Sequence, residues 1–183
     1  MHPLRIKIKL GTLSWHKLRT LFLSVDVELF RRRDDSGRLP IHIACQTNAP
    51  LDVLTALTEC DPATLHMADH AGALPLHEFC RCSCDTTSEF VSGLQCLVHR
   101  GGVGTLAARN RNAALPLHVL CQSATSSSSP PLRAVRFLIQ SFPGSVATRT
   151  NAGQYPFMIA AANASLSLVY EIVRADPVLV FPR

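Results

Sequence analysis

The chain contains the stretch Gly37-Arg-Leu-Pro40-Ile-His42-Ile-Ala-Cys45, which returns three times further along. The second copy is Gly72-Ala-Leu-Pro75-Leu-His77-Glu-Phe-Cys80, and the third is Ala113-Ala-Leu-Pro116-Leu-His118-Val-Leu-Cys121. A divergent fourth copy, Gly153-Gln-Tyr-Pro156-Phe-Met158-Ile-Ala-Ala161, lacks the His and the Cys. Four copies in phase predict a repeat protein, in which each small unit becomes stable by stacking on its neighbours.

A second apolar segment follows each copy of this stretch. Apolar residues stand at i, i+3 and i+6 in every segment, which is the spacing of one stripe on an amphipathic helix. The segments are Leu51–Leu57, Val91–Leu97, Leu132–Leu138 and Leu166–Ile172. A helix-breaking residue stands eleven positions after the start of each segment, at Pro62, Gly102, Pro143 and Pro177. Each unit is therefore expected to be a turn followed by two antiparallel helices.

The residues around the repeated Pro fit a turn that leads into a helix. Pro is favoured in the first helical turn, where an N–H group would have no partner in any case. Gly three residues earlier supplies a positive φ for the turn. Asp34, Asp69 and Asn110 precede the turns and can accept hydrogen bonds from nearby backbone N–H groups. Two turn-rich insertions, at residues 82–87 and 124–131, lengthen the connection between the two helices of a unit.

These residues resemble the ankyrin repeat, whose family pattern is Asp, two residues, Gly, one residue, Thr-Pro-Leu-His, one residue and Ala-Ala, followed by a second helix. The resemblance covers about residues 34–180. It implies an all-α fold, a solenoid of stacked helix-turn-helix pairs with β-hairpin or turn fingers. It also implies that the repeated His links backbone groups across repeats and that the repeated Cys is a small buried residue. The expected role is to bind other proteins without catalysis.

The chain departs from the family pattern at one position in every unit. Leu39, Leu74, Leu115 and Tyr155 stand where the family has Thr. The Thr hydroxyl caps the first helix, and the loss of such a cap costs about 1 kcal/mol. We therefore expect the His of each unit to find its own partners near the start of the helix.

The repeats divide the chain into a basic segment, residues 1–14, and a repeat domain, residues 15–183. Trp15, Leu18 and Leu21 repeat the stripe of a second helix, so residues 15–33 are expected to form a partial repeat. The full repeats span about residues 34–68, 69–109, 110–149 and 150–183. Solenoid ends normally carry a polar outer face. The apolar stretch Val178-Leu-Val-Phe181 therefore predicts an array cut from a longer solenoid or closed by a partner, including end-to-end self-association.

The composition is that of a folded chain without a membrane-spanning segment. Of the 183 residues 47% are apolar, and charged residues interrupt every apolar run before the roughly 18 residues that a transmembrane helix needs. Residues 1–33 hold eight of the 18 Lys and Arg and two acids, whereas the remainder holds ten bases and eleven acids. An odd number of seven Cys without a secretory signal favours reduced thiols and an intracellular, cytoplasmic location. Organelle targeting by residues 1–25 is the alternative.

The main functional hypothesis is a scaffold that binds a protein partner through its finger tips and the concave face of its first helices. These positions vary between units, whereas the stacking positions repeat. Two of the four fingers carry Arg, which favours an acidic partner. No nucleophile stands beside a base and no Gly-rich phosphate loop occurs, so no enzyme, cofactor or small-molecule substrate is expected. The candidate contact residues are Arg33, Asp35, Ser36, Arg38, Gln46, His70, Ala73, Glu78, Arg81, Arg111, Asn112, Gln122, Asn151, Gln154 and Asn163.

Two alternative hypotheses use other residues. The first is a zinc-binding or thiol redox-sensing module, because thiolate and imidazole groups suit Zn²⁺. Its residues are His77, Cys80, Cys82 and Cys84, although their Cys-x-Cys-x-Cys spacing is not the usual one of zinc fingers. The second is binding of nucleic acid or of an acidic membrane surface by the basic residues 5–33. A solvated edge on a truncated repeat explains the same charges, so nucleic acid is not the expected partner.

Overall fold

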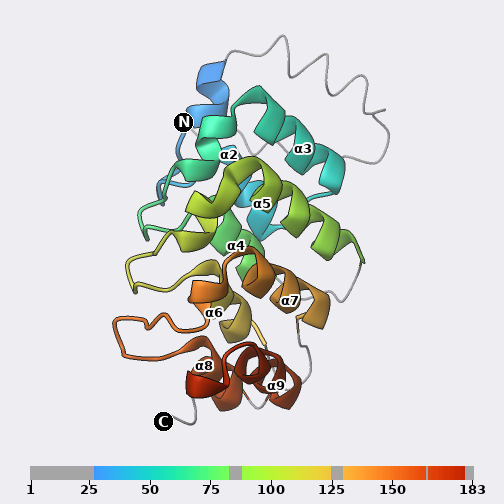
Figure 1. Cartoon of the computed structure of the whole chain (residues 1–183). Helices are drawn as coiled ribbons and strands as arrows, with labels where there is room; N and C mark the ends of the chain where they lie inside the picture. The colour runs from blue at the N-terminus through green and yellow to red at the C-terminus, as the bar shows by residue number, and fades with distance from the viewer. Residues whose placement is uncertain (1–26, 83–87, 125–129, 164, 180–183) are drawn as a thin grey trace.

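The computed structural model describes residues 27–82, 88–124, 130–163 and 165–179 (Figure 1). These residues form eight α-helices and four short 3-10 helices, with no β-strand among them, so the predicted all-α class is confirmed for this part of the chain. The α-helices are α2 (Pro40–Gln46), α3 (Leu51–Cys60), α4 (Pro75–Arg81), α5 (Ser88–Ala107), α6 (Pro116–Gln122), α7 (Leu132–Ser141), α8 (Pro156–Ala162) and α9 (Leu166–Ala175). The 3-10 helices are η1 (Val27–Arg31), η2 (Pro62–His66), η3 (Pro143–Ser145) and η4 (Pro177–Leu179). The expected helix stripe at Trp15, Leu18 and Leu21 lies outside the described residues, as does Phe181.

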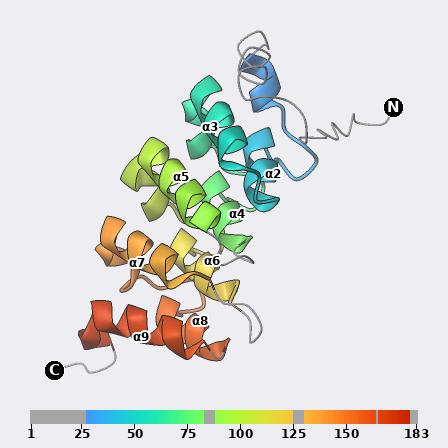
Figure 2. The same ribbon diagram turned by 90° about the vertical axis from the view of Figure 1, so that its right-hand side faces the viewer.

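The α-helices stack in two rows (Figure 2). The first helices α2, α4, α6 and α8 pack on one another in chain order, and the second helices α3, α5, α7 and α9 do the same. Each first helix also packs on the second helix that follows it. The second and third positions of each predicted stripe are therefore buried or half-buried between these helices, whereas the first position is half-buried or exposed, with Leu51 at 39% and Leu166 at 81% exposure.

Every first helix begins at its repeated Pro, as the sequence predicts. The residue before the Pro has nearly the same backbone conformation in all four units, for example φ −84° and ψ 163° at Leu39 and φ −82° and ψ 159° at Tyr155. Extended backbone is the conformation that a following Pro imposes. The start of the helix is thus set locally, before any contact between units.

The second helix of the second unit, α5, begins earlier than the sequence predicts. It starts at Ser88, three residues before the first anchor of the apolar stripe. The physical reason is Phe90, which is fully buried and stacks on Phe79 of α4 with the ring centroids 4.8 Å apart. The predicted break is confirmed, because the backbone leaves the helical conformation at Gly102 with φ 65° and ψ −175°.

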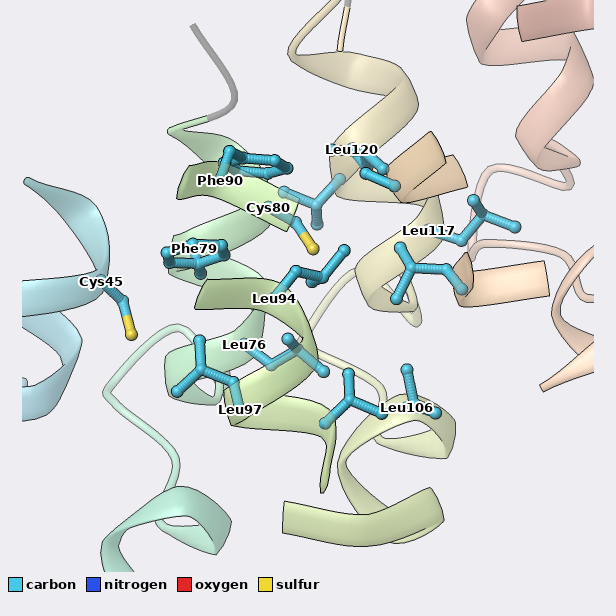
Figure 3. Packing of buried hydrophobic residues seen from close by; sticks show 14 of the residues in the cluster. Cys45, Leu76, Phe79, Cys80, Phe90, Leu94, Leu97, Leu106, Leu117 and Leu120 are labelled. Atoms are coloured by element: carbon cyan, nitrogen blue, oxygen red, sulfur yellow. The ribbon is translucent and has the colours of Figure 1, made fainter. Parts of the chain in front are cut away.

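The core fills the space between the two rows (Figure 3). Phe79, Leu94 and Leu97 are almost completely buried, and so are the three repeated Cys. These thiols are free, and burial raises the pKa of Cys121 to about 12. The expectation that the repeated Cys is a small buried residue is confirmed. Among the described helices, none combines the length and the apolar character needed to cross a bilayer.

Candidate interaction surface

Four turns project to one side of the helices, on the left in Figure 1. We call them finger one (residues 34–38), finger two (69–73), finger three (110–114) and finger four (150–154). One backbone hydrogen bond closes each finger from its first N–H to its last carbonyl, over 3.0 Å in finger one and 2.9 Å in finger two. A second bond runs from the fourth N–H of each finger back to its first carbonyl. Of the two expected forms, β-hairpin or turn, the described fingers are turns without strands.

The first side chain of a finger holds the turn in shape. Asp34 Oδ1 accepts hydrogen bonds from the backbone N–H groups of Ser36 at 3.0 Å and Arg38 at 2.8 Å. Asp69 and Asn110 make the same pair of bonds in fingers two and three, whereas Thr150 Oγ1 accepts one bond, from Gln154 N at 3.3 Å. A fixed loop loses little conformational entropy on binding. Fingers one to three are therefore pre-organised for contact.

Positive φ angles occur where the sequence predicts them. Gly37, Gly72 and Gly153 have φ between 71° and 74°. Finger three has Ala113 at the equivalent position, with φ 54°. This conformation is unfavourable for a residue with a Cβ atom, so finger three holds local backbone strain that fingers one, two and four avoid.

Neighbouring fingers are joined through their backbones. His70 N donates to Ser36 O over 3.0 Å, Arg111 N donates to Ala71 O over 3.0 Å, and Asn151 N donates to Asn112 O over 2.9 Å. The Gly37 backbone lies against the His70 ring so closely that a Cβ atom there would be 2.3 Å from His70 Cδ2. The four tips therefore form one continuous edge, and a partner that contacts one tip also meets the next.

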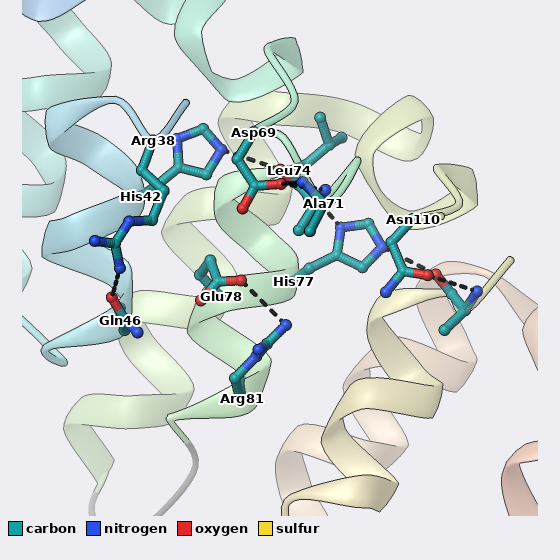
Figure 4. Close-up of polar contacts among 12 residues, drawn as sticks. Arg38, His42, Gln46, Asp69, Ala71, Leu74, His77, Glu78, Arg81 and Asn110 are labelled. Carbon is teal, nitrogen blue, oxygen red and sulfur yellow. Dashed lines mark hydrogen bonds and ion pairs between the residues drawn. The ribbon is translucent and has the colours of Figure 1, made fainter. Parts of the chain in front are cut away.

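The repeated His fastens each first helix to the next unit. His77 Nδ1 accepts the backbone N–H of Leu74 at 3.1 Å, and His77 Nε2 lies 3.1 Å from the carbonyl oxygen of Ala114 (Figure 4). His42 and His118 make the equivalent contacts with the same two distances. The ring nitrogen thus satisfies the N–H of the residue before the Pro, whereas a Thr hydroxyl at that residue would accept an N–H of the first helical turn. Burial lowers the pKa of all three His, and that of His77 to about 4, so the rings are neutral at pH 7.

Several predicted contact residues are exposed, and two are not. Most of the candidates on the tips and the first helices are exposed: Arg33, Asp35, Ser36, Gln46, His70, Arg81, Arg111, Asn112, Gln122, Asn151 and Gln154. Ala73 and Glu78 were predicted to face a partner, and this is wrong, because they are 0% and 4% exposed. Glu78 lies beneath Arg81, whose Nη2 is 3.2 Å from its carboxylate, and burial raises the pKa of Glu78 despite this ion pair.

The other candidates are partly engaged in contacts within the chain. Arg38 is half-buried, pairs with Asp34 over 2.8 Å and donates to Gln46 Oε1 over 2.7 Å (Figure 4). Asn163 is half-buried and its Nδ2 donates to the carbonyl oxygen of Cys121 over 3.1 Å. Arg33 Nη1 donates to Ala68 O over 2.8 Å, which joins the last residue of the partial repeat to the end of unit one. These side chains therefore make contacts within the chain as well as being open in part to solvent.

The residues of the zinc and redox hypothesis do not present free ligand atoms in the described part. Both ring nitrogens of His77 are engaged by backbone groups. Cys80 is fully buried, and burial raises the pKa of its thiol. Cys82 is half-buried, and Cys84 lies outside the described residues. No three His, Cys, Asp or Glu side chains come close enough together to hold a metal ion within the described ranges.

Most of the basic segment also lies outside the described residues, which begin at position 27. Arg31 is described, and its Nε lies 2.6 Å from Asp61 Oδ2 in an ion pair with the following unit. Arg32 and Arg33 are exposed. The structure thus gives one of these charges a role in packing between elements.

Sequence reasoning missed Arg109 and Arg149, which are exposed beside fingers three and four. Arg109 Nη1 lies 3.4 Å from the carbonyl oxygen of Arg149. The guanidinium carbon of Arg149 lies 4.6 Å from the centroid of the Tyr155 ring, a cation–π contact. The run of charges along the chain would have indicated both residues, because residues 90–170 contain six Arg and no acid.

No protein-family model matches the chain, and no curated protein is similar to it at the threshold of significance. Its function is therefore inferred from the chain's own repeat, its finger geometry and its charges.

Proposed function

We propose that the chain is an ankyrin-type repeat scaffold that binds another protein across its finger tips and the faces of its first helices. The resemblance of the sequence to the ankyrin repeat supports this proposal, and so do the two rows of helices and the turn before each first helix. The resemblance implies that the repeated His links backbone groups across units. The bonds of His42, His77 and His118 to neighbouring backbone groups agree with that expectation.

One observation supports the binding function above all: the hydrogen bonds that hold the fingers are equivalent, whereas the exposed residues at the finger tips differ. The first side chains of fingers one to three make equivalent bonds to the backbone, and each tip is bonded to the next. The exposed tip residues differ from one finger to another, from the acidic Asp35 to the basic Arg111 and the neutral Asn151. Such rigid loops on a repeated support suit recognition of a surface without catalysis.

A site-specific photo-crosslinker tests this proposal. Benzoylphenylalanine replaces the exposed Asn112 at the tip of finger three, and in a control protein it replaces the exposed Gln140 of α7, in the other row. Irradiation in native lysate should give discrete protein adducts from position 112 and none of these from position 140. The crosslinker is also placed at His70 and Asn151, the exposed tip residues of fingers two and four. The proposal fails if none of the three tip positions yields an adduct, or if the control position yields the same adducts.

A further inference from the structure

The charges of the chain are divided along the array of units. Residues 34–89 contain nine acids and two Arg, whereas residues 90–170 contain six Arg and no acid. The six are Arg100, Arg109, Arg111, Arg133, Arg136 and Arg149. Counted by unit, the third unit has four Arg and no acid and the first has five acids and one Arg, whereas the second and fourth are close to neutral, so anionic groups are attracted to the third unit and repelled by the first.

Three of these six Arg lie at the fingers, and we call Arg109, Arg111 and Arg149 the arginine cluster. All three are exposed, and no acidic side chain in the described part of the chain pairs with them. By contrast, Arg100 pairs with Glu59 over 2.9 Å and Arg136 pairs with Glu171, both between second helices. The side of the array around fingers three and four thus keeps its positive charge available.

The backbone geometry holds the arginine cluster together. Arg109 reaches the carbonyl oxygen of Arg149 at 3.4 Å, so the two residues stand on adjacent units in contact. Arg111 lies at the tip of finger three, where its N–H donates to Ala71 O and its carbonyl accepts Asn151 Nδ2 at 2.9 Å. Hydrogen bonds between neighbouring units therefore fix the backbone around the three Arg residues that carry these guanidinium groups.

The spacing of the cluster suits an extended peptide with carboxylate side chains. Packed helices lie about 10 Å apart, so equivalent positions in adjacent units, such as those of Arg109 and Arg149, are separated by a similar distance. An extended chain advances about 3.3 Å per residue and covers that distance in about three residues. Guanidinium groups bind carboxylates with paired, charge-assisted hydrogen bonds. The exposed amides of Asn112 and Gln154 add neutral hydrogen-bonding groups beside the cluster.

Two features favour an acidic peptide over nucleic acid. A long polyanion would run from the cluster onto units one and two, where nine acids repel it. Bases would also need an open aromatic surface for stacking. Tyr155, the aromatic ring at the cluster, has Arg149 over its face and stacks with Phe157 at 5.8 Å.

We infer that Arg109, Arg111 and Arg149 form the docking site for a short acidic segment of the partner protein. This inference names the chemistry of the partner and rests on the proposed scaffold function. Two or three carboxylates of the segment pair with the cluster, while the acids of units one and two limit its length.

Fluorescence anisotropy with the intact chain tests the inference. The probe is a fluorescein-labelled ten-residue peptide with six Glu and four Ser. The variant R109Q/R111Q/R149Q is compared with R32Q/R133Q/R174Q, which removes the same number of charges from exposed Arg outside the cluster. We expect the cluster variant to weaken binding at least tenfold and to lose its salt dependence, whereas the control changes affinity less than threefold.

The outcomes separate this inference from the proposed function. Equal loss in the two triple variants, or no binding by the parent chain, overturns the acidic docking site. Tighter, cluster-dependent binding of a ten-nucleotide single strand also overturns it, in favour of a nucleic-acid interface. Discrete crosslinks from position 112 with no binding of the Glu peptide leave the scaffold in place and remove only the acidic segment. If the triple variant fails to fold by circular dichroism, Arg111→Glu alone serves as the test, with the same expected loss.

Discussion

At the residue scale, the repeated His makes two polar contacts, one through each ring nitrogen. In each of the first three units its Nδ1 receives the N–H that precedes the Pro, and its Nε2 reaches a carbonyl of the next unit. A neutral ring with the proton on Nε2 satisfies both contacts. Met158 stands at this position in the fourth unit and is 42% exposed. The fourth unit therefore lacks a fastening that the other three share.

Replacing His77 with Ala tests this fastening. The change leaves the Leu74 N–H and the Ala114 carbonyl without the ring, and each buried group that loses its partner costs about 1–3 kcal/mol. Burial lowers the pKa of His77 to about 4. Between pH 6.5 and pH 4 the unfolded chain therefore binds a proton at this residue and the folded chain does not. The contribution of the neutral His77 ring to the free energy of unfolding is therefore fully present above pH 6.5. It falls towards pH 4, by on the order of 3 kcal/mol.

Urea denaturation at several pH values measures this prediction. His77→Ala should be less stable than the parent at pH 7 and should lose less additional stability between pH 6.5 and pH 4. The exposed His99 provides the control, and His99→Gln should keep the pH dependence of the parent. An equally steep loss in His77→Ala would show that the ring does not resist protonation in the folded state.

At the scale of elements, the close approach of α4 and α5 depends on a Gly. A Cβ atom at Gly93 would lie 2.7 Å from Cζ of Phe79, whose ring is fully buried and stacked on Phe90. Ala is the better helix former by about 1 kcal/mol. Forcing an extra carbon into a packed core costs about 1–3 kcal/mol. Because the Phe79 ring is buried and held by stacking on Phe90, we expect packing to outweigh propensity.

Gly93→Ala should therefore lower the free energy of unfolding, by about 1–2 kcal/mol. Gly104→Ala is the matched control in the same helix, since the nearest atom to a Cβ there is His66 Cε1 at 3.9 Å. That control should be neutral or slightly stabilising. Combining Gly93→Ala with Phe79→Leu should cost less than the sum of the two single changes. A stabilised Gly93→Ala, measured by urea denaturation, would contradict the packing argument.

At the scale of the whole molecule, the last described helices of the array differ from its middle in the apolar surface that they expose. The inner face of α9 is buried through Leu168 and Ile172, whereas Leu166 and Tyr170 on its outer side are 81% and 64% exposed. Val178 in η4 is 58% exposed as well. Exposed apolar groups that gather on one face mark a surface suited to association. The prediction of end-to-end self-association stays a prediction, now with a defined surface.

Sedimentation velocity at increasing concentration checks this prediction. The parent chain should show species larger than the monomer, and Leu166→Gln with Tyr170→Gln should return it to the monomer, because polar side chains weaken the apolar contact. Val103 of α5 is 59% exposed and provides the control, since Val103→Gln should leave association unchanged. A parent chain that stays monomeric at every concentration would refute self-association.

The sequence by itself determined the features that local chemistry controls. Each first helix starts at its Pro and the backbone breaks at Gly102, because these residues restrict or release φ without help from distant contacts. The apolar spacing placed the second helices to within a few residues. Only the tertiary structure decided which polar side chains are available for binding. Glu78 is buried, and Arg109 meets Arg149, because these outcomes depend on packing between residues about 40 positions apart in the chain, where no local rule applies.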